Sequence, residues 1–228
     1  MSSLFSYENK FMQVLMTLGD LIILNFLFLI CSLPIVTMGA AQAGLYTAVR
    51  TITDKNDDTS PTKAFFRGFK SGFVKISLVW VVFLVVIVAS LLAFFSLNPG
   101  FTKVMAMIGF CIVAILETMT MMFHSRFDCT PIQLLRNSVL LFLAHPLRVI
   151  PATFLSWLSL LIALYDPNSF IAMGPIFLTL FISVTFMLAY GIMYKPFKDL
   201  VDMTLEKQGL KPIEEPQEET EEDEDEDE

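Results

Sequence analysis

A long apolar run near the middle of the chain limits its fold more than any other feature. Residues 77–95 read SLVWVVFLVVIVASLLAFF, in which only Ser77 and Ser90 are polar. A helix needs about 20 apolar residues to cross the hydrocarbon core of a bilayer, and the run over residues 76–97 is that long. It therefore predicts a transmembrane helix.

Four other stretches are apolar enough to span a bilayer: residues 11–33, 101–123, 147–165 and 170–194. Hydrophobic residues make up 55% of the chain and charged residues 17%, whereas soluble domains usually have about 45–50% and about 25%. We therefore expect an all-α fold, a polytopic transmembrane helix bundle of about five spans that forms one domain over residues 1–200. The lipid bilayer is its first expected partner.

The charged residues are distributed unevenly along the chain. Of the 23 acidic residues, 12 lie in residues 214–228, and the rest of the chain has 15 basic and 11 acidic residues. The acidic stretch has no apolar content to bury, which predicts a disordered acidic cytoplasmic tail over residues 201–228. The remaining charge does not form the basic surface of a nucleic-acid-binding protein, so we expect no nucleic acid partner.

The loops between the apolar runs predict how the chain is oriented. Loops 50–75 and 124–148 and the C-terminal end contain thirteen Lys and Arg residues, whereas the other side has two, Lys10 and Lys103. Membrane proteins carry their excess of positive charge in cytoplasmic loops. We therefore expect a multi-pass protein of the cell membrane with the N-terminus outside and the C-terminus in the cytoplasm.

Both long loops contain an amphipathic segment that starts with a capping residue and a proline. These pairs are Ser60-Pro61 and Thr130-Pro131, and Ser or Thr at the N-cap with Pro at the first helical position favours a helix. Apolar stripes flanked by Lys and Arg are typical of helices that lie in the membrane interface. The loops thus predict two cytoplasmic interface helices, over residues 61–73 and 131–145.

The chain around Pro34 can follow two courses, because proline either kinks a helix or begins a new one. In the first, the first span continues past Pro34 as a kinked helix. In the second, which we favour slightly, the span ends near Leu33 and a separate short helix over residues 36–51 packs at the inner boundary. A return of this segment to the outside would place six basic residues on the wrong side.

The stretch LNFLFLICSLPIVTMGAAQAGLYTAVRTI, followed by FFRGFKSGFVK, resembles the YesL-like family of uncharacterised bacterial integral membrane proteins. The matching positions include Asn25, Pro34, Thr37 and Gly39, and Asn137 fits in SRFDCTPIQLLRNSVLLFLAHP. The resemblance covers about residues 15–200, without the acidic tail. It implies no enzymatic activity. Family members are often found beside carbohydrate uptake and degradation genes, which implies an association with sugar transport.

Glu117 is the strongest single candidate for a functional residue, because a carboxylate inside a membrane span is costly to bury. It is either a proton or cation relay that faces a cavity, or a neutral or paired side chain that holds helices together. His124 shares its helical face, and Arg126 could reach back to it. Asn25, in the first span, is predicted to bond a neighbouring helix rather than a ligand.

The segment 34–44 is rich in small residues, including Gly39, which favours close helix packing. A binding groove at this break, lined by Pro34 and Thr37, is the alternative, since irregular backbone at membrane depth usually lines protein or a cavity. The chain has no G-x-S-x-G, HExxH, phosphate loop or paired carboxylates. We therefore expect no enzyme, no cofactor and no metal site.

Two functions remain open. The first is an accessory or regulatory component of carbohydrate uptake, with sugar transporter subunits as partners. The second is a small oligomeric transporter or channel that uses Glu117 and the helix break over residues 34–44, and for it a homo-oligomer is expected.

Overall fold

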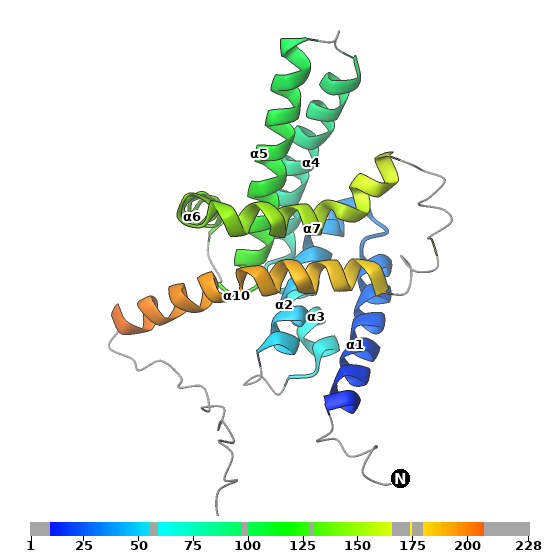
Figure 1. The fold of residues 1–228 in the computed structure, drawn as a ribbon, viewed down its shortest axis with the longest axis vertical. Helices are drawn as coiled ribbons and strands as arrows, with labels where there is room; N and C mark the ends of the chain where they lie inside the picture. The colour runs from blue at the N-terminus through cyan, green and yellow to red at the C-terminus, as the bar shows by residue number, and fades with distance from the viewer. Residues whose placement is uncertain are drawn as a thin grey trace, which may run out of the picture. The chain divides into compact units, whose positions relative to one another are not determined.

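The computed structural model describes residues 10–54, 59–96, 100–127, 130–165, 174 and 180–207, and these contain helices and no strand (Figure 1). The expected all-α fold is thereby confirmed. In chain order the elements are α1 Lys10–Cys31, η2 Ile35–Thr37, α2 Met38–Thr53, α3 Pro61–Lys70, α4 Phe73–Ser96, α5 Phe101–His124, α6 Pro131–Ala144, α7 Pro146–Tyr165 and α10 Ile182–Lys207.

Three of the described helices, α1, α4 and α5, are long and apolar enough to cross a membrane. Helices α6 and α7 pass the same requirement only as a pair, and the two are bent by 117° at the break between them. The described residues therefore contain three or four candidate spans. The predicted fifth span, 170–194, lies partly outside the described residues, so the count of five stays a prediction.

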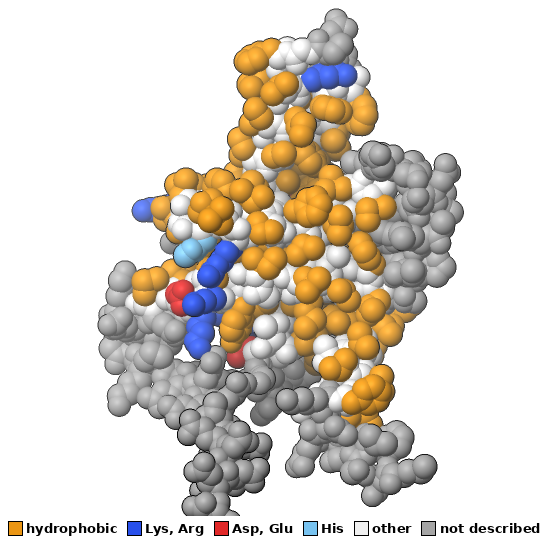
Figure 2. Space-filling view, viewed as in Figure 1, with side chains coloured by type: hydrophobic (Ala, Val, Ile, Leu, Met, Phe, Trp, Pro, Cys, Tyr) orange, Lys and Arg blue, Asp and Glu red, His pale blue; other side chains and the backbone are white. Residues whose placement is uncertain are grey.

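Helices α4 and α5 pack side by side as an antiparallel hairpin joined near Gly100 (Figure 1). Their shared face packs on Trp157 of α7 and forms a core of buried side chains: Val79, Phe83, Ile87, Ala114 and Trp157. The outer face is equally apolar, as Figure 2 shows, with Val85 63% and Phe95 70% exposed. Exposure of this apolar outer face to water would be unfavourable, whereas the hydrocarbon core of a bilayer is a suitable solvent for it.

The chain breaks at Pro34, as the second of the two predicted courses requires. Helix α1 ends at Cys31, a single 3-10 turn follows, and α2 begins at Met38. The Thr37 hydroxyl lies 2.7 Å from the carbonyl oxygen of Cys31 and 2.8 Å from that of Pro34. It can therefore satisfy a carbonyl that the end of α1 leaves without a helical partner. Helix α2 is nearly all buried and packs on α1, α3, α4 and α5.

Helix α3 packs its small and apolar side on α2 through two glycines. A Cβ at Gly44 would lie 2.8 Å from the carbonyl oxygen of Phe65, and one at Gly68 would lie 3.0 Å from Cα of Gly44. Ala64 and Phe65 are fully buried, whereas Phe66 is 39% exposed. Much of the apolar stripe that the sequence suggested for the membrane interface is therefore covered by protein.

Helix α6 has the N-terminal cap that the sequence predicted, and α3 does not. Thr130 Oγ1 accepts a hydrogen bond from the backbone N–H of Gln133, and Gln133 Oε1 accepts one from the N–H of Thr130. Ser60 occupies the N-cap position of α3, followed by Pro61 as predicted, but its side chain makes no such bond, so the expectation of a side-chain cap there was wrong. Helix α6 also exposes large apolar side chains, with Ile132 79% and Leu143 67% exposed, as an interface helix would.

The chain forms two compact units, Met1–Tyr194 and Lys195–Glu228. Helix α10 continues to Lys207, past the predicted start of the tail at residue 201, so residues 201–207 are helical rather than disordered. The predicted acidic tail beyond them, residues 208–228, lies outside the described residues.

Candidate functional site

Glu117 lies on α5, is 1% exposed, and is the centre of a buried polar cluster. Its Oε2 accepts a hydrogen bond from the Thr118 hydroxyl at 3.3 Å, while Oε1 is buried with no hydrogen-bond partner. No ion pair compensates the carboxyl group within the part of the chain that the structure describes. A buried carboxylate in this position is expensive unless it is protonated or has a counter-charge.

Side chains from two other helices approach the same carboxyl group. Gln42 of α2 and Trp157 of α7 both lie near it, but neither makes a hydrogen bond with Oε1. Trp157 Nε1 donates instead to Thr118 Oγ1 at 3.1 Å, so indole, hydroxyl and carboxylate form a chain. Gln42 Oε1 is a second buried oxygen without a partner.

A hydrogen bond joins α2 directly to α7. The hydroxyl groups of Tyr46 and Ser156 lie 2.7 Å apart, and Tyr46 is fully buried. The Tyr46 ring packs on Phe186 of α10 with 4.8 Å between ring centroids. Helices α2, α5 and α7 therefore meet around Glu117 through polar side chains, inside a shell of apolar ones.

Gly39 explains how α2 comes close enough to reach Glu117. A Cβ at this position would meet Cβ of Trp80 on α4 and would lie 3.2 Å from the terminal methyl of Met121 on α5. Only glycine allows so close a backbone approach. Because Gln42 is three residues after Gly39 and Glu117 is four before Met121, this contact brings Gln42 beside the carboxyl group.

His124 and Arg126 do not join Glu117, contrary to the pairing that the sequence suggested. His124 Nε2 bonds the carbonyl oxygen of Ser71 at 3.0 Å, next to the turn at Gly72, which has a φ of +62°. Arg126 Nε donates to the Tyr190 hydroxyl at 2.6 Å. Both side chains are thereby directed away from Glu117.

Asn25 bonds a neighbouring helix, as predicted. Its Oδ1 accepts hydrogen bonds from the backbone N–H and the hydroxyl of Ser183, and Asn25 itself is fully buried. Neither bond involves a residue of the cluster around Glu117, and the bonds to α10 give Asn25 a structural role.

The family comparison matches part of this arrangement. Residues 21–94 match the family model described as "Protein of unknown function, DUF624". This segment, called the DUF624 segment below, runs from within α1 to near the end of α4. YesL-like proteins belong to that family. No curated protein and no solved structure matches the chain. Together with its apolar helices, the match shows a membrane protein.

The DUF624 segment contains four of the six predicted site residues: Asn25, Pro34, Thr37 and Gly39. Pro34 is exposed and Thr37 half-buried, and both serve the helix break rather than the carboxyl group. Asn137, on α6 outside the segment, is half-buried and takes part in none of the side-chain hydrogen bonds among the described residues. The structure therefore gives no role to Asn137.

The DUF624 segment also supplies site residues that the sequence did not single out, Gln42 and Tyr46. The signal that could have found Gln42 is a lone amide in a run of small residues, since a polar side chain there needs an interhelical partner. Trp157 and Thr118 lie outside the segment. Nothing in the linear sequence links them, because their contact depends on where α7 crosses α5.

Proposed function

We propose that this multi-pass membrane protein is an accessory or regulatory component that works beside a carbohydrate uptake system and docks through helix α3. The association with carbohydrate uptake comes from the YesL-like resemblance. The observation that supports docking is the geometry of α3. Its small and apolar side is held on α2, which leaves Lys63, Arg67 and Lys70 exposed on the opposite side.

These three cations make α3 suited to an acidic partner surface. They are spaced at four and three residues, so they share one face of the helix. The close approach of Gly44 and Gly68 fixes that face relative to the bundle. A row of positive charge on a helix held in place attracts an acidic partner surface and favours one orientation of it.

Affinity purification from native membranes with a short cross-linker tests this proposal. The tagged protein is expected to recover permease or ATPase subunits of a sugar transporter. The triple variant K63E/R67E/K70E is expected to lose them, because the row of charge is reversed. K103E, a charge reversal predicted to lie on the opposite side of the membrane, is the matched control and should retain the partners. Recovery of the protein alone, or retention of transporter subunits by the triple variant, would contradict the proposal.

A small oligomeric transporter or channel is the second candidate, and the cluster around Glu117 favours it. Its carboxyl oxygen Oε1 and the amide oxygen of Gln42 are both buried without partners, and acceptor oxygens in that state suit a proton or a small cation. The cluster joins α5 to α2, the helix that begins at the break after Pro34.

Proton and solute flux into liposomes tests this second function. The purified chain is expected to conduct, and E117Q, which keeps the shape and removes the ionisable group, is expected to abolish proton-coupled flux. S90A changes a hydroxyl on α4 that bonds only its own helix at an exposed position, so it should leave the flux unchanged. Equal flux in E117Q and the unmodified chain would remove Glu117 from the mechanism.

A further inference from the structure

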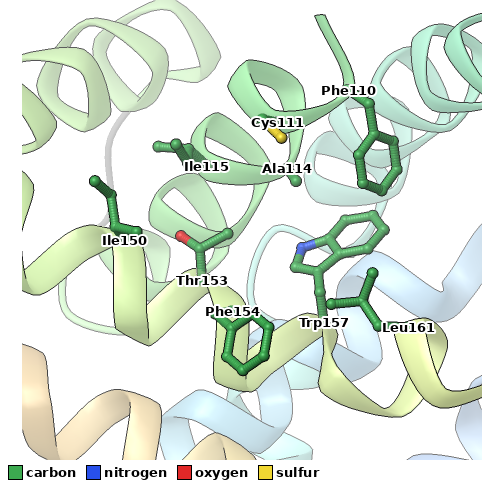
Figure 3. A pocket seen from close by; sticks show the side chains of 9 residues that line it. All are labelled: Phe110, Cys111, Ala114, Ile115, Ile150, Thr153, Phe154, Trp157 and Leu161. Atoms are coloured by element: carbon green, nitrogen blue, oxygen red, sulfur yellow. The ribbon is translucent and has the colours of Figure 1, made fainter. Parts of the chain in front are cut away.

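An apolar pocket of about 210 Å³ lies between α5 and α7 and is lined on one side by Trp157 (Figure 3). It is larger than an engineered cavity of about 150 Å³ that is lined by aliphatic and aromatic side chains and binds benzene. Ala114 and Trp157 form its buried wall, and Ile150 and Phe154 form its rim, 53% and 56% exposed. The pocket therefore opens on the outer apolar surface.

One polar group faces this apolar space. Thr153 is 7% exposed and lines the pocket, and its hydroxyl is buried with no hydrogen-bond partner. Figure 3 shows the hydroxyl oxygen of Thr153 on the side of Ile115 and Ile150. A threonine in a helix can satisfy its hydroxyl on a carbonyl one turn earlier, as Ser156 does on Ala152. Thr153 makes no such bond, so its hydroxyl lies buried at the wall of the pocket without a partner.

The depth of the pocket identifies the medium outside it. Its wall on α5 is formed by residues from Phe110 to Ile115, at the middle of a candidate span that runs from Phe101 to His124. The middle of a span lies in the hydrocarbon core. Molecules available at that depth are aliphatic, so neither a sugar nor a free ion reaches this opening.

We infer that the pocket between α5 and α7 binds the aliphatic chain of a lipid-soluble molecule that carries one hydroxyl or carbonyl oxygen, which bonds to Thr153. This goes beyond the proposed function. The aliphatic chain of the ligand fills the space against Trp157. The rings of Phe110 and Trp157 pack edge to face, with 5.4 Å between their centroids. The same indole donates a hydrogen bond to Thr118, and Thr118 donates one to Glu117. The bound ligand therefore contacts Trp157, from which hydrogen bonds lead to the Glu117 carboxyl group.

Tryptophan fluorescence can test whether an aliphatic chain enters the pocket, because the protein has two tryptophans that can be examined one at a time. W80F leaves Trp157 at the pocket, and W157F leaves Trp80, which is buried and does not line it. The full chain is reconstituted in vesicles of phosphatidylcholine with dibrominated acyl chains, which quench on contact. Trp157 is expected to be quenched more strongly than Trp80. Equal quenching would overturn the inference and would indicate that protein, such as a second copy, covers the pocket.

Filling the pocket separates a bound chain from lipid that merely surrounds the protein. Cys111 lines the pocket and is exposed, so hexyl methanethiosulfonate can place six carbons there once Cys31 and Cys129 are replaced by Ser. The quenching of Trp157 should fall with the hexyl reagent, persist with the methyl reagent, and return after reduction. If W80F does not fold, the protein that keeps both tryptophans can be used instead. The decrease in its quenching on hexylation then measures the contact between lipid and Trp157. Quenching that hexylation does not change would overturn the inference.

Competition between an alcohol and an alkane tests the role of Thr153. Dodecanol is expected to relieve the quenching at a mole fraction roughly two- to tenfold lower than dodecane, which is the ratio that one neutral hydrogen bond provides. T153V keeps the shape of the side chain and should abolish the difference. Equal competition by the two compounds in the unmodified chain would overturn the assignment of an oxygenated ligand.

Discussion

Asn25 and Ser183, which lie 158 residues apart in the sequence, share two hydrogen bonds. Asn25 Oδ1 accepts both, from the backbone N–H and from the hydroxyl of Ser183, each at 3.1 Å. A side chain on α1 thus bonds the first turn of α10. The pair therefore joins the first described helix to the last.

Replacing Asn25 with Ala should lower the free energy of unfolding by about 1–3 kcal/mol, because the Ser183 groups would stay buried without an acceptor. Thermal unfolding in detergent measures the effect as a lower Tm. T17A is the matched control, because the Thr17 hydroxyl bonds Gln13 within α1 at an exposed position. A similar Tm for N25A and T17A would contradict a structural role for Asn25.

Two glycine-to-alanine substitutions should shift stability in opposite directions. At Gly68 an added Cβ would meet the Thr47 hydroxyl and lie 2.7 Å from Thr47 Cβ, so G68A should cost about 1–3 kcal/mol by overpacking α3 against α2. At Gly19, within α1, a Cβ would meet nothing within 4 Å. G19A should therefore stabilise by up to about 1 kcal/mol through helix propensity. Thermal unfolding checks both, and a Tm for G68A at or above that of the unmodified chain would show that α3 does not pack closely on α2.

The N-terminal caps of α3 and α6 predict another unequal pair. T130A removes a hydroxyl that accepts from Gln133 in a capping box and should cost about 1 kcal/mol. S60A removes a hydroxyl that makes no capping bond and should leave stability nearly unchanged. Tm values of both variants, measured in one detergent, make the comparison. The geometry would be contradicted if S60A were the more damaging substitution.

The orientation predicted from the Lys and Arg distribution can be tested by cysteine labelling. In a chain whose own cysteines are replaced, N98C should react with an impermeant maleimide from outside intact cells. D57C should react only after the cells are permeabilised, because the loop 50–75 carries six of the thirteen cations predicted to be cytoplasmic. Reaction of D57C, but not N98C, from outside would reverse the topology and remove the basis for cytoplasmic docking through α3.

Several features of the fold could be predicted from the sequence because they depend on neighbours in the chain. The apolar run over residues 76–97 predicts α4 by its length and hydropathy alone. The Thr130-Pro131 pair predicts the start of α6, because the cap is made by a side chain three residues from its partner. Pro34 predicts either a kink or a break, because its ring clashes with the carbonyl four residues earlier.

Other features could not be predicted in this way, and the candidate site is among them. Glu117 could be singled out because a carboxylate is costly to bury in a membrane span, but the residues around it could not be predicted. Its expected neighbours on the same helix and in the next loop turn to Ser71 and Tyr190 instead. Gln42 reaches Glu117 because Gly39, three residues earlier, lets α2 lie directly on Trp80.

The sequence by itself determined that this is a helical membrane protein, because hydropathy and charge add up along a segment whatever the segment later contacts. Only the tertiary structure decided that Glu117 meets α2 and α7, that α3 turns its small side to α2, and that Thr153 faces a pocket. Those outcomes depend on how closely two backbones approach. A single methyl group at a glycine would change that distance, and residues far apart in the sequence determine it together.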